Sequence, residues 1–222
     1  MKKVLVMAVH PDDETLGCGG TLLKHKAAGD DLFWLIATDT AKEYGPGTPA
    51  VKRRQKEIER VAAAYGFTDT FRLCLPAKSI DIIPVAELIT KISAVIEKVK
   101  PETVYLPFQG DVHSDHRYFF NAAYSCLKTF RNPFIKTVLM METISETEFA
   151  LTLEENTFIP NYFVDISRYF KTKLEIMAVY KNEIQKHPFP RSKKNIEALA
   201  IFRGAMANCF YAESFMLLKG IV

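Results

Sequence analysis

Cysteine is scarce in this 222-residue sequence, and the four cysteines are not arranged for a shared task. None forms a C-x-x-C pair, and each lies among apolar or small residues: Cys18, Cys74, Cys126 and Cys209. This pattern favours reduced, buried thiols over disulfide bonds or a thiolate metal site. No cysteine stands in a nucleophile–base dyad, so we do not expect covalent catalysis through a thiol.

Long apolar runs and a strong net charge are also missing. No stretch reaches the roughly 20 apolar residues of a membrane span. The apolar run at residues 3–9 meets acidic residues without a cleavage-site pattern, which predicts a strand rather than a signal peptide. The net charge of +3 is too small to indicate nucleic-acid binding. We therefore expect a cytoplasmic protein with no membrane span and no nucleic-acid partner, and the sequence leaves homo-oligomerisation open.

Apolar strand-like runs alternate with amphipathic helical segments from the first residues onward. The expected strands cover residues 3–9, 31–38, 70–76, 103–108 and 136–142. The expected helices cover residues 15–28, 50–65, 85–100 and 115–130. Alternation of this kind predicts an α/β fold, a Rossmann-like three-layer sandwich with a mostly parallel sheet.

We expect a single domain over residues 1–222. Its Rossmann-like core, 1–142, is followed by a C-terminal part, 143–222, that completes the sheet and the substrate site. For that part we expect a strand or cover, two helices, and aromatic side chains that pack on a helix: 157–167, 171–186, 195–202 and 211–215.

The first expected strand runs directly into His10-Pro11-Asp12-Asp13-Glu14. Such a cluster costs stability unless something binds it. Pro11 holds His10 in an extended conformation, and adjacent residues in a stiff turn face different directions. Asp12 and Asp13 can therefore have two tasks, one binding a metal and the other holding a water beside it.

A second polar segment, "GDVHSDH" at residues 110–116, follows the fourth expected strand. Ligands of a doubly wound sheet bind at the carboxyl ends of its strands, so this segment should meet the first one there, together with Asp39 and Glu142. Acidic residues after a strand often only begin a helix, where they suit the helix dipole. Two such segments at the same edge are harder to explain as structural.

The two segments together predict a metal site. His10, Asp13 and one histidine of the pair His113 and His116 would supply three protein ligands and leave positions for water and substrate. This is the pattern of catalytic zinc, and the same donor set also suits a non-haem Fe(II) centre. We expect zinc as the metal, and iron(II) is also compatible with these ligands.

Three glycines, Gly17, Gly19 and Gly20, raise the alternative of a phosphate-binding turn at a helix start. They follow the acidic residues, which would repel phosphate, and the G-x-G-x-x-G fingerprint is absent. Close packing of the helix on the sheet is the better interpretation.

The motifs resemble those of a known family. "AVHPDDETLGCGG" is similar to the A-H-P-D-D-E signature of the PIG-L/LmbE family of metal-dependent N-acetylglucosaminyl deacetylases, and "GDVHSDHR" resembles its D-x-H-x-D-H block. The segments "RRQKEIERVAAAYGF" and "HPFPRSKKNIEALAIFRGAMANCFYAESF" resemble its Arg/Glu helix and its carboxyl-terminal block. The resemblance covers nearly the whole chain and implies a Rossmann-like sheet and removal of N-acyl groups from amino sugars or their conjugates.

Carried over by position, the resemblance implies that His10, Asp13 and His116 bind the metal. It makes Asp12 the general base and His113 the residue that steadies or protonates the reacting centre.

Further site residues have less defined roles. Asp115 is expected to orient His113 or His116, and Glu14 either braces the ligands or only begins the helix. The expected substrate-binding residues are Arg54, by the resemblance, and Asp111, Asn161 and Arg191.

The sequence therefore predicts a zinc-dependent deacetylase of an N-acetylglucosamine-type amino sugar or its conjugate. An amidase that cleaves a larger acyl group from a thiol or glycan conjugate is the alternative among enzymes. A metal-binding module without turnover, or a nucleotide-binding Rossmann-like module, is the alternative outside them. Asp12 argues against the inert module, since a storage site needs no spare base.

Overall fold

The computed structural model describes residues 1–222, apart from the side chain of Lys42. Within the described residues, seven strands form one sheet in the order β3-β2-β1-β4-β5-β7-β6. The strands β1 to β5 pair in parallel, whereas β7 pairs antiparallel with both β5 and β6. The strands are β1 (Lys3–Ala8), β2 (Asp31–Asp39), β3 (Asp69–Pro76), β4 (Thr103–Leu106), β5 (Thr137–Met141), β6 (Tyr162–Asp165) and β7 (Ala212–Gly220).

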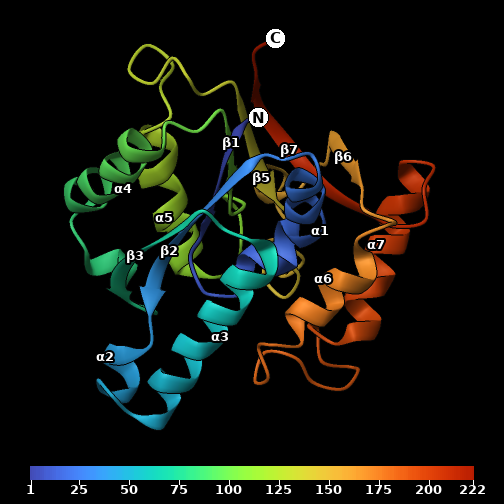
Figure 1. The fold of residues 1–222 in the computed structure, drawn as a ribbon, viewed down its shortest axis with the longest axis horizontal. Coiled ribbons are helices and arrows are strands. Elements are labelled where there is room, and N and C mark those ends of the chain that lie inside the picture. Colours follow the sequence, from blue (N-terminus) through green and yellow to red (C-terminus); the bar gives the residue numbers. More distant parts are fainter.

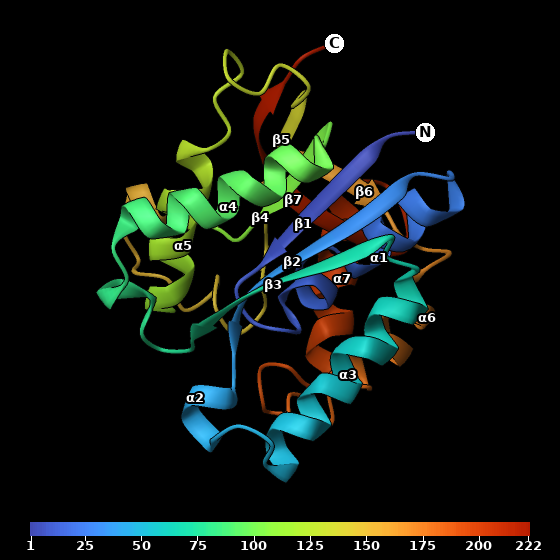
Figure 2. The same ribbon diagram turned by 60° about the vertical axis from the view of Figure 1, so that its left-hand side comes forward.

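Helices cover both faces of the sheet, which makes the expected three layers (Figure 1). On one face lie α4 (Val85–Val99) and α5 (Ser114–Ser125). On the other lie α1 (Asp13–Ala27), α3 (Pro49–Tyr65), α6 (Phe170–Met177) and α7 (Lys193–Met206). The turned view in Figure 2 separates the same two groups and shows α2 (Ala41–Tyr44) beyond the carboxyl end of β2. Two short 3₁₀ helices occupy Ile80–Ile82 and Glu154–Asn156.

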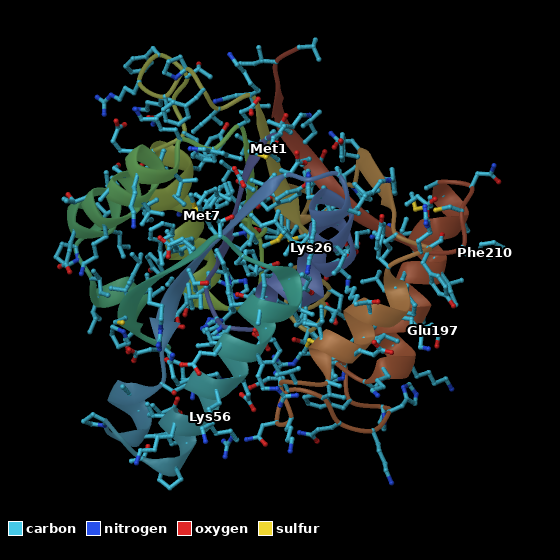
Figure 3. All side chains as sticks on the ribbon, viewed as in Figure 1. Met1, Met7, Lys26, Lys56, Glu197 and Phe210 are labelled. Carbon is cyan, nitrogen blue, oxygen red and sulfur yellow. The ribbon has the colours of Figure 1, made fainter. Side chains whose placement is uncertain are left out.

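The central strands are apolar throughout because both of their faces are covered. In β1 every residue after Lys3 is buried, whereas the edge strand β3 is mostly exposed or half-buried. Met7, which is fully buried, lies inside the molecule in Figure 3, and Phe210, 84% exposed, lies at its periphery. Among the described residues, no helix is long and apolar enough to cross a membrane.

The expected α/β class with a mostly parallel sheet is confirmed, but some elements differ from the prediction. Residues 212–215 enter β7, a strand that the sequence did not predict, whereas Tyr211 does pack on a helix as expected, stacking on Phe170 of α6 with ring centroids 4.1 Å apart. Short apolar runs fit either element, and here pairing with β5 and β6 decides. Helix α6 ends at Met177 and α5 at Ser125, both earlier than their helical patterns predicted. The segment between the strand expected at 31–38 and the helix expected at 50–65 contains α2, for which no helix was predicted.

The glycines of α1 allow close packing, as predicted. A Cβ on Gly17 would lie 2.8 Å from Met141 Cβ, and one on Gly20 would lie 2.7 Å from Ile166 Cβ. Real Cβ atoms do not approach so closely, and overpacking a buried contact costs free energy. The glycines thus let the helix that carries Asp13 approach the end of β5.

Helix α1 is kinked at Cys18, which has non-helical backbone angles. Distant side chains bind the backbone groups around the kink. Lys173 Nζ donates to the carbonyl of Leu16 at 2.9 Å, and the Glu213 carboxylate accepts from the N–H groups of Gly20 and Thr21 at 2.8 and 2.7 Å. Lys173 and Glu213 also form a buried ion pair at 2.7 Å. This pair connects α6 and β7 to the helix that begins at the site.

The close contact between Gly20 and Ile166 predicts a non-additive mutant pair. Gly20→Ala should lower the free energy of unfolding by about 1–3 kcal/mol through overpacking. Ile166→Ala should lower it by about 2–5 kcal/mol through the cavity that it leaves. The double variant should lose less than the sum, since each change makes room for the other. Urea denaturation measures all three, and strict additivity would contradict the proposed contact.

Candidate active site

Two loops bring the predicted polar segments together at the carboxyl edge of the sheet. The turn at residues 9–12 connects β1 to α1, and the loop at 107–113 connects β4 to α5. Because β1 and β4 are neighbours in the sheet, the loops that leave them meet. A cavity of about 580 Å³ lies at this edge, and His10, Asp12 and Asp13 line it together with residues of several other loops.

Three donor atoms converge beside the cavity. His116 Nε2 lies 3.3 Å from His10 Nδ1 and 3.4 Å from Asp13 Oδ2, and His10 Nδ1 lies 3.9 Å from the same oxygen. Donors that share a tetrahedral zinc ion at bond lengths of 2.0–2.2 Å lie about 3.3–3.6 Å apart. Two imidazole nitrogens and one carboxylate oxygen at this spacing therefore fit a divalent metal ion.

Each histidine of this group has a carboxylate on the nitrogen that faces away from the convergence point. His116 Nδ1 lies 2.7 Å from Asp111 Oδ2, and His10 Nε2 lies 3.4 Å from Asp115 Oδ2. Such partners fix the ring orientation and tautomer of metal-binding histidines. The same arrangement on both histidines supports the metal interpretation more strongly than the spacing alone.

A second group of donors, His10, His113 and Asp115, is also close enough to bind a metal. It shares His10 with the first group, so the two are alternatives. The group formed by His10, Asp13 and His116 is the better metal site, because a carboxylate lies behind each of its histidines, whereas His113 Nδ1 bonds a backbone N–H.

Asp13 is held in place by the end of β1. Its Oδ2 accepts hydrogen bonds from the N–H groups of Val9 at 2.9 Å and His10 at 2.8 Å. Burial acts to raise the pKa of Asp13, but the charge and hydrogen bonding of His116 and His10 outweigh burial and hold this pKa below its usual value. The carboxylate is thus ionised and ready to bind a cation.

Asp12 faces elsewhere, as its neighbour relation to Asp13 predicted. Its Oδ2 accepts from Arg191 Nη1 at 2.9 Å, and the side chain lines the cavity. Burial, followed by the negative charge of Asp13, raises the pKa of Asp12 well above its usual value. Its φ of 149° is rare for a residue with a side chain. A strained, buried carboxylate with a raised pKa is typical of a functional group.

Glu14 lies behind the turn rather than in the cavity wall. It is fully buried, and its carboxylate binds the Asp12 N–H at 3.1 Å, the Thr15 hydroxyl at 2.6 Å and the Tyr180 hydroxyl at 2.9 Å. Burial raises the pKa of Glu14 to about 7. Of the two roles left open for it, bracing the turn matches these contacts.

His113 caps the start of α5 and also lines the cavity. Its Nδ1 accepts the Asp115 N–H at 3.1 Å, so the neutral ring carries its proton on Nε2. Burial, and then the proximity of His10 and His116, lowers the pKa of His113 to about 4. His113 is therefore a neutral hydrogen-bond donor at neutral pH.

Two arginines reach the cavity from distant segments, and one glutamate joins them. Arg54, on α3, binds Glu183 through Nη2 and the carbonyl of Pro11 through Nη1 at 3.2 Å. Arg191 lies 3.3 Å from the other oxygen of Glu183, besides its bond to Asp12. The network connects α3, the turn after β1 and the loop at 178–192.

Comparison with known proteins identifies the family. The family model described as PIG-L, GlcNAc-PI de-N-acetylase, matches residues 5–127, more than half of the chain. The chain belongs to the PIG-L family. Deacetylases of this family are metal-dependent, and the His/His/Asp group described above is present in this member.

Two curated relatives match a larger part of this PIG-L chain than the family model does. Diacetylchitobiose deacetylase of Thermococcus kodakarensis is 28% identical over 235 residues, covering 100% of this chain and 85% of the relative. The probable N-acetyl-alpha-D-glucosaminyl L-malate deacetylase 2 of Bacillus cereus is 26% identical over 196 residues, covering 83% of this chain and 84% of the relative. The homologues are thus deacetylases of N-acetylglucosamine-type compounds.

One solved structure of similar fold belongs to an enzyme with a different reaction. GalB, the 4-carboxy-2-hydroxymuconate hydratase of Pseudomonas putida, matches with a TM-score of 0.77 and 17% identity, covering 100% of this chain and 98% of GalB. A hydratase therefore has the same fold, so the fold does not by itself specify the reaction.

Some residues of this PIG-L chain lie elsewhere than the sequence predicted. Asp111, expected to bind substrate, is fully buried behind His116 and accepts from the Thr147 hydroxyl at 2.6 Å. The Asp115 carboxylate lies 3.4 Å from His10 Nε2, a histidine that the sequence did not assign to it, and its backbone N–H donates to His113 Nδ1 at 3.1 Å.

Two further side chains do not line the cavity. Asn161 is exposed at the start of β6, where its Oδ1 accepts the Leu217 N–H at 2.7 Å. Glu142, expected at the shared edge with Asp39, instead binds Arg203 Nε at 2.8 Å and the Ser214 hydroxyl at 2.6 Å. Asp39 does line the cavity.

Sequence reasoning missed other residues of the site. The helix expected at 171–186 includes Glu183, and no motif marks Thr143 or Thr147. Glu183 and Thr147 reach the site through loops, whereas Thr143 lies two residues beyond β5, so the edge rule for parallel strands could have indicated it.

The contact between Asp111 and His116 should affect how tightly this PIG-L chain binds a metal. Asp111→Ala should weaken zinc binding about 10- to 100-fold, because it releases the ring of a ligand. Competition with a chromophoric chelator measures the dissociation constant. Glu142→Ala removes a comparably placed carboxylate that touches no ligand, and it should leave the zinc affinity unchanged. Equal affinities in the wild type and Asp111→Ala would exclude this role.

Proposed function

We propose that this PIG-L chain is a zinc-dependent hydrolase that removes the N-acetyl group from an N-acetylglucosamine-type amino sugar or its conjugate. The observation that carries the proposal is the pairing of two carboxylates at one turn. Asp13 joins His10 and His116 at a metal-binding point, and Asp12 beside it is directed into the cavity. Family membership and the deacetylase relatives support the reaction class.

His10, Asp13 and His116 would hold the metal. When bound, a divalent ion would polarise the amide carbonyl and lower the pKa of a water molecule. Two imidazoles and one carboxylate are the ligands of many catalytic zinc sites. The same set is used by non-haem Fe(II) centres, so the donor chemistry supports both ions and zinc is our first choice.

Asp12 acts as the general base in this proposal. It removes a proton from the attacking water while the water oxygen forms a bond to the amide carbon. When the carbon–nitrogen bond breaks, the same carboxyl group returns the proton to the leaving amine, and acetate and the free amino sugar result. A raised pKa suits both transfers, since the group must bind and release a proton near neutral pH. Arg191 fixes the direction of this carboxylate.

His113 stabilises the developing oxyanion by donating its Nε2 proton in a hydrogen bond. Of the two roles that the sequence left open, steadying the reacting centre suits a ring with a pKa of about 4 better than transferring a proton does. Arg54 and Arg191 line the cavity, where they can bind the polar substituents of a sugar.

The first test is catalysis and its metal dependence. Zinc-loaded protein should release acetate from at least one compound in a panel of N-acetylglucosamine, its oligomers, nucleotide sugars and glycoside conjugates. Removing the metal with a chelator should abolish turnover, and zinc should restore it. Anaerobic loading with iron(II) compares the two metals, and analogues with longer acyl groups test the amidase alternative. Stoichiometric metal without acetate release from any member would exclude the proposed activity.

The second test separates the base from the ligands. Asp12→Asn should keep stoichiometric zinc but lose about 10²- to 10⁴-fold in kcat/KM, the usual contribution of a general base. Asp39→Asn, in the same cavity, should change activity little. Elemental analysis and an acetate assay provide the two readouts. Loss of zinc together with activity in Asp12→Asn would instead make Asp12 a ligand.

A further inference from the structure

One buried hydroxyl in the cavity wall has no hydrogen-bond partner. Thr143 lies just beyond the end of β5, is fully buried and lines the cavity, and its Oγ1 bonds to no other described residue. A buried hydroxyl is nearly always bonded, and an unbonded one needs an explanation. The natural explanation in a binding cavity is a ligand atom that completes the bond.

Two other buried threonines have hydrogen-bonded hydroxyl groups, and Thr143 differs from them in this respect. Thr38 Oγ1 donates to the carbonyl of Val9 at 2.8 Å, and Thr147 Oγ1 donates to Asp111 at 2.6 Å. A second unbonded buried atom, Arg191 Nε, belongs to another side chain that lines the same cavity. Two unsatisfied polar groups of one cavity indicate a polar ligand.

The position of Thr143 is fixed by the metal centre. Its N–H donates to Thr147 Oγ1 at 2.9 Å, and its carbonyl accepts the Thr147 N–H at 2.9 Å. Thr147 binds Asp111, which binds His116. Four residues in one chain of bonds thus hold the free hydroxyl in a set relation to the metal ligand. Such pre-organisation is what selective recognition requires.

We propose that Thr143 Oγ1 hydrogen-bonds a hydroxyl group of the amino-sugar ring and so selects sugars over plain acetamides. The inference rests on the proposed deacetylase function, in which the reacting amide is handled by the metal ligands, Asp12 and His113. The groups that remain for Thr143 are the ring hydroxyls. A threonine hydroxyl both donates and accepts, and it therefore matches another hydroxyl.

The test compares two substrates and two variants. Thr143→Val keeps the shape and removes the hydroxyl, whereas Thr143→Ser keeps the hydroxyl. For N,N′-diacetylchitobiose, Thr143→Val should lower kcat/KM about 10- to 100-fold, as loss of one buried hydrogen bond does, and Thr143→Ser should stay near the wild type. For N-cyclohexylacetamide, which has no ring hydroxyls, Thr143→Val should match the wild type.

Melting temperature and zinc content exclude a merely structural role. Thr143→Val removes an unbonded hydroxyl, so it should melt no lower than the wild type and keep its zinc. Thr147→Val is the structural comparison, because it breaks the bonds to Asp111 and to the Thr143 N–H. It should melt lower, bind zinc more weakly and lose activity on both substrates.

The outcomes separate the two proposals. An equal loss on both substrates, or no loss on the sugar, overturns the role of Thr143 and leaves the deacetylase standing. If the wild type releases acetate from neither compound nor from any member of the panel described above, the proposed function falls. Calorimetric titration of zinc-loaded protein with N,N′-diacetylchitobiose then tests Thr143 directly. Weaker binding by Thr143→Val then supports the role. Equal affinities, or no binding by the wild type, overturn it.

Discussion

The site depends on one interaction, the return of the Asp13 carboxylate to the last peptide groups of β1. By accepting the N–H groups of Val9 and His10, a single oxygen ends the strand, starts α1 and presents a negative charge to both histidines. The unusual backbone of Asp12 follows from this closure, since the chain must turn sharply between the strand and the helix. Rigid placement of the proposed ligands and strain at Asp12, the proposed base, thus have one cause.

Two adjacent residues of the same type have acquired opposite properties. Both aspartates are buried, which alone would raise the pKa of each. Asp13 lies beside two imidazoles, which reverse the effect. Asp12 lies near the negative charges of Asp13 and Glu183, which add to the effect of burial, and near two arginines, which oppose it. The difference between the two pKa values therefore arises from the directions of the two side chains, and the turn sets those directions. A regular helix or strand at this point would not separate the directions of the two side chains in this way.

The parts that sequence predicted well are local in their causes. Strands buried on both faces are continuous apolar runs, and the edge rule for parallel sheets places His10 and His116 together from their chain positions alone. Glu183 and the pairing of β7 depend on loops and on contacts between distant segments, for which residue spacing carries no signal. Asn161 shows the converse, since a polar residue near an expected binding segment instead binds the backbone of β7.

The anchoring of α1 by Glu213 has a consequence for synthesis of the chain. The hydrogen bonds from Gly20 and Thr21 to this carboxylate span 193 and 192 residues, and β6 pairs only with β7 among the described strands. During synthesis, the N–H groups of Gly20 and Thr21 and the backbone of β6 therefore lack these partners until almost the entire chain has been made. Helix α1, which begins with Asp13, therefore obtains its bonds to Glu213 only when almost the whole sequence has been synthesised.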